Sequence, residues 1–115
     1  MNYRKLEVYQ LAIRFLLIAV QFAHAMLLGY ASFADQLRGA SLSVPLNIAE
    51  GSGKITGPDQ RRFYAIARGS AMECGAIVDA CLILGFIDGP AASRSNEILD
   101  SIMRMLSKMA RPDPD

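Results

Sequence analysis

The segment Gly51-Ser52-Gly53-Lys54 comes closest in this chain to a chemical motif, because glycines followed by a lysine are typical of phosphate-binding loops. The nucleotide-binding version needs a glycine five residues before the second glycine, a serine or threonine directly after the lysine, and a preceding strand. Ile48 and Ile55 occupy those two positions, and a helical pattern precedes the segment. The sequence therefore argues against an ATP- or GTP-binding loop.

Acid–base and nucleophilic catalysis has few candidate residues. His24 is the only histidine and falls among apolar residues of a predicted helix, which leaves serine and cysteine nucleophiles without an obvious base. Glu50 and Glu73 form a carboxylate pair only if the two helices that carry them bring them together. We therefore expect no enzyme activity and no catalytic residues.

The two cysteines, Cys74 and Cys81, lie seven residues apart. On a helix this spacing places them on one face about 10 Å apart, beyond the reach of a disulfide bond. Neither a C-x-x-C nor an H-x-x-x-H spacing occurs, so no metal site and no cofactor are predicted. Both residues are expected to be buried free thiols, which indicates a reducing compartment.

Charge is unevenly distributed along the chain, although the 115 residues carry a formal net charge of only +1. Residues 36–72 have an excess of three positive charges, and residues 73–115 have an excess of three negative charges. The basic residues of the first segment are Arg38, Lys54, Arg61, Arg62 and Arg68. They are candidates for contacting nucleic-acid phosphates at one end of the molecule.

The same cations have a second interpretation as a solvated face with ion pairs inside the molecule. Arg68 with Glu73, and Arg38 with Glu50, are the pairs that we expect in that case. The sequence alone leaves both interpretations open.

The N-terminal third combines features of an export signal with features that argue against one. Arg4 and Lys5 precede an apolar run at 15–22, and Ala23-His24-Ala25 has the small-x-small form of a cleavage site. However, Glu7 and Arg14 interrupt the stretch that should be free of charge, and a helical period continues through it. Gln21 and His24 also disfavour a membrane span. We expect a cytoplasmic protein that does not contact membranes.

Apolar periodicity decides the fold class. In the first helix, spacings of three and four residues predict a buried stripe of Leu6, Tyr9, Ile13, Leu16, Val20, Ala23 and Leu27. Further apolar residues lie off this stripe, which predicts that a second layer or another subunit covers them. Gly29 and Ser32 predict a turn and the cap of the second helix.

Four helices are predicted, at about 4–28, 33–50, 58–84 and 95–110. Pro45 is expected to kink the second helix without ending it, since the apolar spacing continues past it. A glycine-rich loop at 51–58 follows, with Thr56 as the predicted cap of the third helix. Gly85 is the stop of that helix, and Ser93 or Ser95 is expected to cap the fourth. No segment alternates with a period of two, so we predict one domain, 1–115, folded as an all-α antiparallel up-down four-helix bundle.

Three segments, 3–12, 36–51 and 63–73, carry the resemblance of this chain to a known family. They include Pro45-Leu-Asn47-Ile-Ala-Glu50-Gly51 and Ala67-Arg68-Gly69-Ser70. Together they resemble the four-helix-bundle family named for proteins encoded in intervening sequences of bacterial 23S rRNA genes. The resemblance implies a homopentameric ring of antiparallel bundles in the bacterial cytoplasm. We expect structural roles for the polar motif residues Asn47, Glu50, Ser70 and Glu73. Asn47 and Glu50 would bond backbone groups freed at the Pro45 kink or pair with Arg68, and the small Ser70 would allow close packing of helices.

A related branch of that family accompanies the reverse transcriptases of diversity-generating retroelements, and in that branch a strongly basic ring is thought to engage nucleic acid. This chain differs in its net charge near zero and in Gly39, which stands where the family commonly has a second arginine after Arg38. The first functional hypothesis is a non-enzymatic oligomeric bundle that binds RNA or DNA through a cationic ring surface. The alternative is a protein-binding adaptor or scaffold without a nucleic-acid partner.

Overall fold

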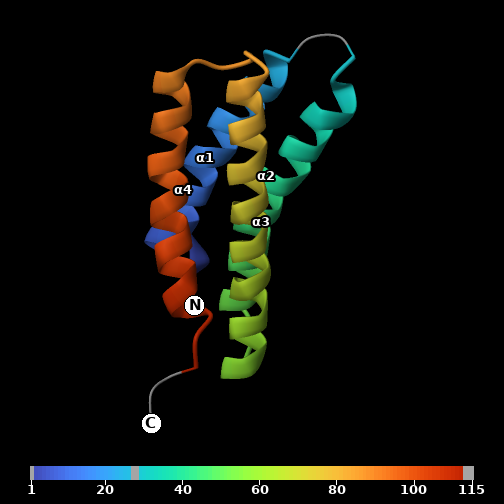
Figure 1. The fold of residues 1–115 in the computed structure, drawn as a ribbon. Coiled ribbons are helices and arrows are strands. Elements are labelled where there is room, and N and C mark those ends of the chain that lie inside the picture. Colours follow the sequence, from blue (N-terminus) through green and yellow to red (C-terminus); the bar gives the residue numbers. More distant parts are fainter. Residues whose placement is uncertain (1, 27–28, 113–115) are drawn as a thin grey trace.

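The computed structural model describes residues 2–26 and 29–112 and contains, within them, helices and no strands. A 3-10 turn, η1 (Tyr3–Lys5), precedes four helices: α1 (Glu7–His24), α2 (Ala31–Ser52), α3 (Gly57–Ile83) and α4 (Gly89–Met109). Figure 1 shows α1 beginning and α4 ending at the lower end, with α2 and α3 joined there as well. The predicted all-α four-helix fold is therefore confirmed.

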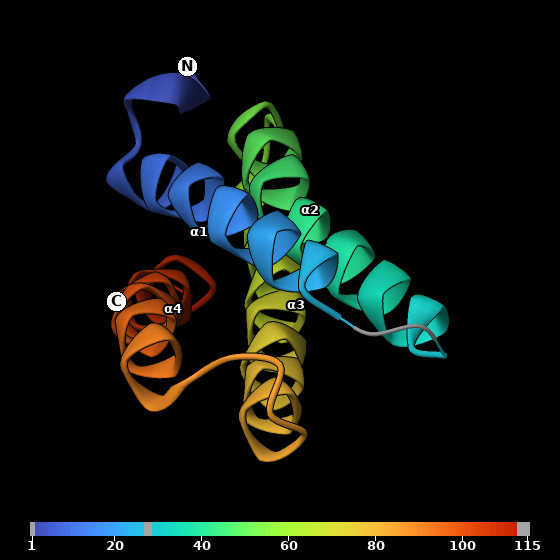
Figure 2. The same cartoon turned by 90° about the horizontal axis from the view of Figure 1, so that it is seen from above.

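Each helix packs against its neighbours in a closed circuit. The main contacts join α1 to α2, α2 to α3, α3 to α4, and α4 back to α1. Seen from above, α2 and α4 lie on opposite sides of the bundle (Figure 2). The molecule is elongated, with extents of 49 × 22 × 20 Å. The two ends of the bundle are thus well separated, and each end is built from parts of all four helices.

The first helix differs from its predicted bounds and its predicted buried face. Leu6 is extended (φ −70°, ψ 126°), so the predicted helix divides into η1 and α1. α1 ends at His24, and the predicted last residues Leu27 and Leu28 lie outside the described residues. The buried residues of α1 are Val8, Ala12, Phe15, Ala19 and Ala23. Ala23 of the predicted stripe is buried, and Leu6 and Tyr9 pack against the core in partly buried positions. The centre of the buried face, however, lies at Ala12, Phe15 and Ala19 and not at the predicted Ile13, Leu16 and Val20.

Small side chains explain this difference. A core face of alanines lets neighbouring helices approach closely, and such close packing leaves room for few large side chains. Phe15, Leu37, Ile48, Ile102 and Leu106 are the largest fully buried apolar side chains, and they come from α1, α2 and α4. Of the bulky residues in the predicted stripe, Ile13 is 41% exposed and the others described are only partly buried. Leu17, which lies beside the stripe, is 63% exposed.

The other helix boundaries follow local capping. Thr56 caps α3 as predicted, since its Oγ1 accepts a hydrogen bond from the Asp59 amide at 3.3 Å. α4 begins at Gly89, six residues before the predicted start, because the Asp88 side chain accepts from the Ala91 amide at 2.9 Å. Neither Ser93 nor Ser95 is its cap. Likewise α2 begins at Ala31, so Ser32 lies inside the helix.

The second helix is continuous through Pro45 and extends beyond the predicted glycine-rich loop boundary. α2 includes Gly51 and Ser52, both buried, so the loop to α3 is only 53–56. Gly51 allows α2 and α3 to approach closely: a Cβ atom at this position would lie 2.7 Å from Cε1 of Tyr64 and 3.1 Å from Cβ of Phe63. Glycine is needed here for space and not for an unusual backbone angle.

Gly51→Ala is expected to lower the free energy of unfolding by about 1–3 kcal/mol, because the buried Tyr64 ring must shift. Urea denaturation measures this change. Gly39→Ala is the matched control in the same helix, since a Cβ atom added there would have no other side chain within 4 Å. The control should be neutral or slightly stabilising. Equal effects of the two substitutions would contradict the close approach at Gly51.

Candidate functional site

The antiparallel topology sorts the charged residues by end. We use "cationic end" for the lower halves of the four helices together with η1, the α2–α3 loop and Arg111. Among the described residues this end holds ten basic side chains and four carboxylates. The basic residues are Arg4, Lys5, Arg14, Lys54, Arg61, Arg62, Arg68, Arg104, Lys108 and Arg111, and the acidic ones are Glu7, Glu50, Asp59 and Asp100. The lower half therefore carries a large positive excess.

The opposite end has the reverse balance, and we call it the "anionic end". Among the described residues, the upper halves of the helices and their connecting segments hold two basic side chains, Arg38 and Arg94. Five carboxylates accompany them: Asp35, Glu73, Asp79, Asp88 and Glu97. The near-zero net charge of the chain thus conceals two ends of opposite sign.

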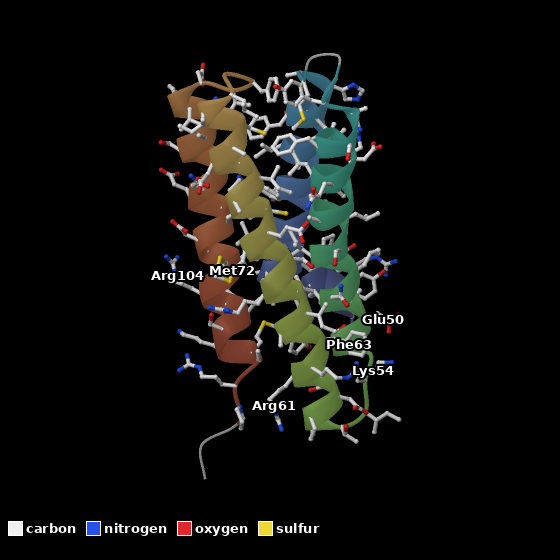
Figure 3. All side chains as sticks on the ribbon, turned by 45° about the vertical axis from the view of Figure 1, so that its right-hand side comes forward. Glu50, Lys54, Arg61, Phe63, Met72 and Arg104 are labelled. Atoms are coloured by element: carbon white, nitrogen blue, oxygen red, sulfur yellow. The ribbon has the colours of Figure 1, made fainter. Side chains whose placement is uncertain are left out.

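Four of the five predicted phosphate-contacting residues lie at the cationic end. Lys54 is in the α2–α3 loop, and Arg61, Arg62 and Arg68 are in the first half of α3. Figure 3 shows Lys54 and Arg61 at the lower end of the bundle. The fifth, Arg38, lies in the first half of α2 near the other end, where its Nη1 is 3.0 Å from Oδ1 of Asp35. The structure brings the first four to one end and keeps Arg38 apart.

Few of these charges are paired. Within residues 2–26 and 29–112, the ion pairs are Arg38 with Asp35 and Lys54 with Glu50, the latter at 3.5 Å. The expected pairs of Arg68 with Glu73 and Arg38 with Glu50 do not form. Arg68 instead donates from Nε to Oγ of Ser107 at 2.7 Å. Nine of the ten basic side chains of the cationic end thus lack a carboxylate partner in the described part of the chain.

Aromatic rings at the cationic end are in contact with basic side chains. Nζ of Lys54 lies 4.9 Å from the centroid of the Phe63 ring, and the Arg62 guanidinium lies 4.7 Å from the same centroid. Arg4 lies 4.9 Å from the centroid of the Tyr3 ring. Such cation–π contacts hold the basic side chain over the ring by electrostatic attraction, but they do not neutralise its positive charge. Phe63 was not among the predicted site residues.

Two of the four polar motif residues, Ser70 and Glu73, bond from α3 to α2, whereas Asn47 bonds within α2. The hydroxyl groups of Ser43 and Ser70 are 2.8 Å apart, and Nδ2 of Asn47 donates to the Ser43 carbonyl at 2.8 Å. Nε2 of Gln36 donates to Oε2 of Glu73 at 3.5 Å. Glu50 belongs to the cationic end, beside Lys54. Asn47, Ser70 and Glu73 therefore make hydrogen bonds within a helix or between helices, as expected of residues with a structural role.

The possible carboxylate pair of Glu50 and Glu73 is absent. Glu73 reaches Gln36, which precedes Glu50 by 14 residues on α2. At 1.5 Å per residue that separation is about 21 Å along the helix. Glu50 and Glu73 consequently lie too far apart to act on one substrate atom. In the described residues, no group of three or more histidine, cysteine, aspartate or glutamate side chains is arranged to hold a metal ion.

The cysteines are buried and poorly ionised. Cys74 and Cys81 are both 0% exposed and form no disulfide. Burial, with a smaller contribution from the Glu73 charge, raises the pKa of Cys74 to about 12, and burial raises the pKa of Cys81. A thiol of such a pKa is a weak nucleophile at neutral pH, since the thiolate is the reactive form.

Iodoacetamide at pH 8 is therefore expected to label the folded protein very slowly at both cysteines. A pKa of about 12 at Cys74 reduces its thiolate fraction roughly a thousandfold relative to an exposed thiol, and burial blocks the reagent as well. Mass spectrometry of the intact chain measures the labelling. The same chain unfolded in urea serves as the control and should be labelled fast. Rapid labelling of the folded protein would contradict the buried position of both thiols.

In the part of the chain that the structure describes, no helix has both the length and the hydropathy needed to cross a membrane.

Comparison with known proteins agrees with this architecture. The family model of the 23S rRNA-intervening sequence protein matches residues 4–108. No curated protein sequence matches the chain at a significant level. A crystal structure of a Bacteroides thetaiotaomicron protein of unknown function from the S23 ribosomal protein family has the same fold, with a TM-score of 0.83. The two chains are 16% identical over 91% of this chain and 99% of the other. Because the family model spans nearly the whole bundle, the chain belongs to the 23S rRNA-intervening sequence protein family.

Proposed function

We propose that this protein is a non-enzymatic, oligomeric four-helix bundle of the cytoplasm that binds RNA or DNA through the phosphates that meet its cationic end. One observation carries the proposal: nine basic side chains gather at that end without a carboxylate partner among the described residues. Buried free thiols agree with a reducing compartment.

Basic side chains without a carboxylate partner are the groups that bind the phosphates of a polyanion most readily. Each Lys or Arg that neutralises a phosphate releases a condensed counterion, so binding is favoured by entropy and weakens as salt is added. A cation already held by a carboxylate gains less, because it must first give up its partner. The one pair found at this end in the described residues, Lys54 with Glu50, is exposed, and pairs of that kind stabilise a protein by at most about 1 kcal/mol.

Oligomer formation is supported by apolar side chains on the outer faces of α1 and α2. On α1, Ile13 and Leu17 are one helical turn apart. On α2, Leu42 and Leu46 are also one turn apart, and their side chains are 45% and 55% exposed. His24 of α1 and Arg38 of α2 border the same depression, so the antiparallel register places Leu17 level with Leu42 and Leu46. The four residues thus lie at similar levels on two helices that pack against each other, and we call them the "lateral patch".

The lateral patch fits the homopentameric ring that the family resemblance implies. Contacts through the sides of the bundles leave both ends uncovered. In a cyclic ring whose axis is roughly parallel to the helices, rotation places every cationic end on the same face. Five copies then present one broad basic surface, and several weak contacts with one nucleic acid act together.

A salt titration tests the proposal. Fluorescence anisotropy of a labelled 20-nucleotide RNA hairpin measures binding at 50 to 200 mM KCl. We expect the affinity to fall steeply over this range, with a slope set by the number of phosphates contacted. Arg61→Gln with Arg62→Gln should weaken binding about tenfold and reduce the slope by about two. The matched control replaces the two cations of the other end, Arg38→Gln with Arg94→Gln, and should have little effect. Absence of binding at 50 mM KCl both to this hairpin and to the DNA hairpin of the same sequence would refute the proposal.

A protein-binding adaptor is the second candidate, and the anionic end favours it. Tyr30, Leu82, Ile83 and Leu84 are 39%, 41%, 84% and 47% exposed near the start of α2 and the end of α3. Clusters of exposed apolar side chains are typical of protein-binding surfaces. An oligomer that ignores the RNA hairpin at every salt concentration would favour the adaptor over nucleic-acid binding.

A further inference from the structure

We infer that the nucleic acid bound by this protein is a double helix, held by its backbone along a strip of basic residues on α3 and α4. This inference rests on the proposed function and adds the class of ligand and the place where it lies. The strip, which we call the "α3–α4 strip", consists of Arg61 and Arg68 on α3 and Arg104, Lys108 and Arg111 at the end of α4.

The α3–α4 strip has two rows of basic residues, one on each of two neighbouring helices, and the two rows have the same length. Arg61 and Arg68 are seven residues apart, as are Arg104 and Arg111, and each interval spans about 10 Å along a helix. Packed helices lie about 8–10 Å apart. The hydrogen bond from Arg68 to Ser107 fixes the two rows side by side. One row covers about three nucleotide steps of a duplex strand, at about 3.4 Å per step.

Three arginines of the strip are held in place without loss of charge. Nε of Arg68 donates to Oγ of Ser107 at 2.7 Å, and Nε of Arg111 donates to the carbonyl of Ser107 at 3.2 Å. Nη2 of Arg104 donates to Oγ of Ser101 at 3.2 Å. Hydroxyl and carbonyl oxygens orient the guanidinium groups but do not neutralise them. Remaining N–H groups are left to donate to phosphate oxygens, for which the planar guanidinium is well suited.

The surface beside α4 is hollowed. An open depression of about 660 Å³ is lined by Arg104, Ser107, Lys108 and Arg111, together with two methionines and Asp100. Asp100 is the only carboxylate in this lining. Figure 3 shows Arg104 on the outer side of α4 and Arg61 projecting from α3 at the lower end of the bundle. A ligand lying across this region meets several cations and one opposing charge.

Aromatic rings at the cationic end are poorly available for stacking. Recognition of single strands depends largely on exposed rings on which unpaired bases stack. Here Lys54 and Arg62 both lie against the Phe63 ring. The Tyr3 ring has Arg4 against it and packs edge to face with Tyr9, with 4.9 Å between the two ring centroids. Tyr64 is only 6% exposed. At the cationic end the described rings of Tyr3, Tyr9 and Phe63 are partly buried and that of Tyr64 is buried, whereas nine of the ten basic side chains there lack a carboxylate partner among the described residues. This balance favours contacts with phosphates over stacking of bases, which suits a regular backbone whose bases are already paired.

A comparison of the binding of matched oligonucleotides tests the inference. Anisotropy at 100 mM KCl compares one 20-nucleotide sequence as single-stranded RNA, single-stranded DNA, duplex RNA and duplex DNA. We expect both duplexes to bind about tenfold more tightly than their single strands, because a duplex presents two phosphate rows to the strip. A preference between the two duplexes still supports the inference and identifies the natural source. Single strands that bind as well as the duplexes would overturn it.

Substitutions locate the strip. Arg104→Gln with Lys108→Gln should weaken duplex binding about tenfold and reduce the salt slope by about two. Both side chains are exposed, so the fold should tolerate the change. Arg94→Gln, in the first half of the same helix, is the matched control and should change neither quantity. Duplex binding that survives the double substitution would refute the strip. If no oligonucleotide binds the unmodified protein, the proposed function itself fails, and that result is distinct from a preference for single strands.

Phe63→Leu provides a further readout. It removes the ring but keeps an apolar side chain beside Lys54 and Arg62. The ratio of duplex to single-strand affinity should stay unchanged. A selective loss of single-strand binding would show that bases stack on Phe63, against the inference.

Discussion

Phe15→Ala is expected to lower the free energy of unfolding by about 3–5 kcal/mol. Phe15 is 0% exposed and is the largest fully buried side chain, in a core whose other contributions from α1 are Val8 and alanines. Its removal leaves a cavity that the small neighbouring residues of α1 cannot fill. Because domains of this size are stable by only about 5–15 kcal/mol, the loss is a large part of the total. Urea denaturation followed by circular dichroism measures it.

Ile55→Ala is the control for this prediction. Ile55 is 99% exposed in the α2–α3 loop, so its truncation should change stability by less than about 0.5 kcal/mol. A cost below about 1 kcal/mol for Phe15→Ala would show that the ring is not enclosed by the core.

Leu17→Asp combined with Leu46→Asp is expected to convert the proposed oligomer into single bundles of 12.5 kDa. Both residues belong to the lateral patch and are 63% and 55% exposed, so the isolated bundle should tolerate aspartate at both positions. In an interface, however, the same substitutions bury unpaired charges, which costs several kcal/mol at each contact. Sedimentation velocity measures the change, and for a pentamer it is a fivefold loss of mass.

Ile55→Asp is the matched control for the lateral patch, since it places the same charge on another exposed apolar residue, away from the sides of the bundle. Its assembly should be unchanged. An unmodified protein that sediments as a single bundle would refute the ring, and an oligomer that survives the double substitution would place the interface elsewhere. Circular dichroism of each variant checks that the helices are retained.

Local sequence signals were sufficient for most of the fold. Glycine and proline punctuation separated four helical segments, and the stop at Gly85, where φ is +79°, is a turn that favours glycine. The cap at Thr56 followed from its own side chain and its position before Pro58. Caps and turns depend on residues close together in the chain, so a single sequence is enough to predict them.

Predictions failed where the outcome depended on packing between helices. In α1, periodicity alone favours the stripe with the larger apolar residues, but the structure buries the neighbouring face that carries Ala12, Phe15 and Ala19. The start of α4 at Gly89 differs from the predicted start at 95 for another reason. Asp88-Gly89-Pro90 is typical of a turn, yet aspartate also caps a helix and proline fits its first turn.

The candidate site was predictable only in part, since it is assembled from distant segments. Residues 73–115 have a negative balance as a segment, which hid the cations Arg104, Lys108 and Arg111 at its end. Arg4 and Lys5 precede an apolar run and so resemble the basic start of an export signal, which conceals their place at the cationic end. The strip could have been found by asking which helix ends meet in an up-down bundle. No sequence pattern predicts the hydrogen bonds that the arginines donate to Ser101 and Ser107.

The opposite charges of the two ends also give the molecule a large electric dipole along its 49 Å axis. A polyanion at a distance exerts a torque on such a dipole before any contact forms, and it turns the basic end forward. Orientation during approach raises the fraction of collisions that are productive, so it increases the association rate more than it lengthens the lifetime of the complex. A protein with near-zero net charge can therefore still be oriented by a polyanion as it approaches, and because salt screens charges at a distance, this orientation weakens as salt is added.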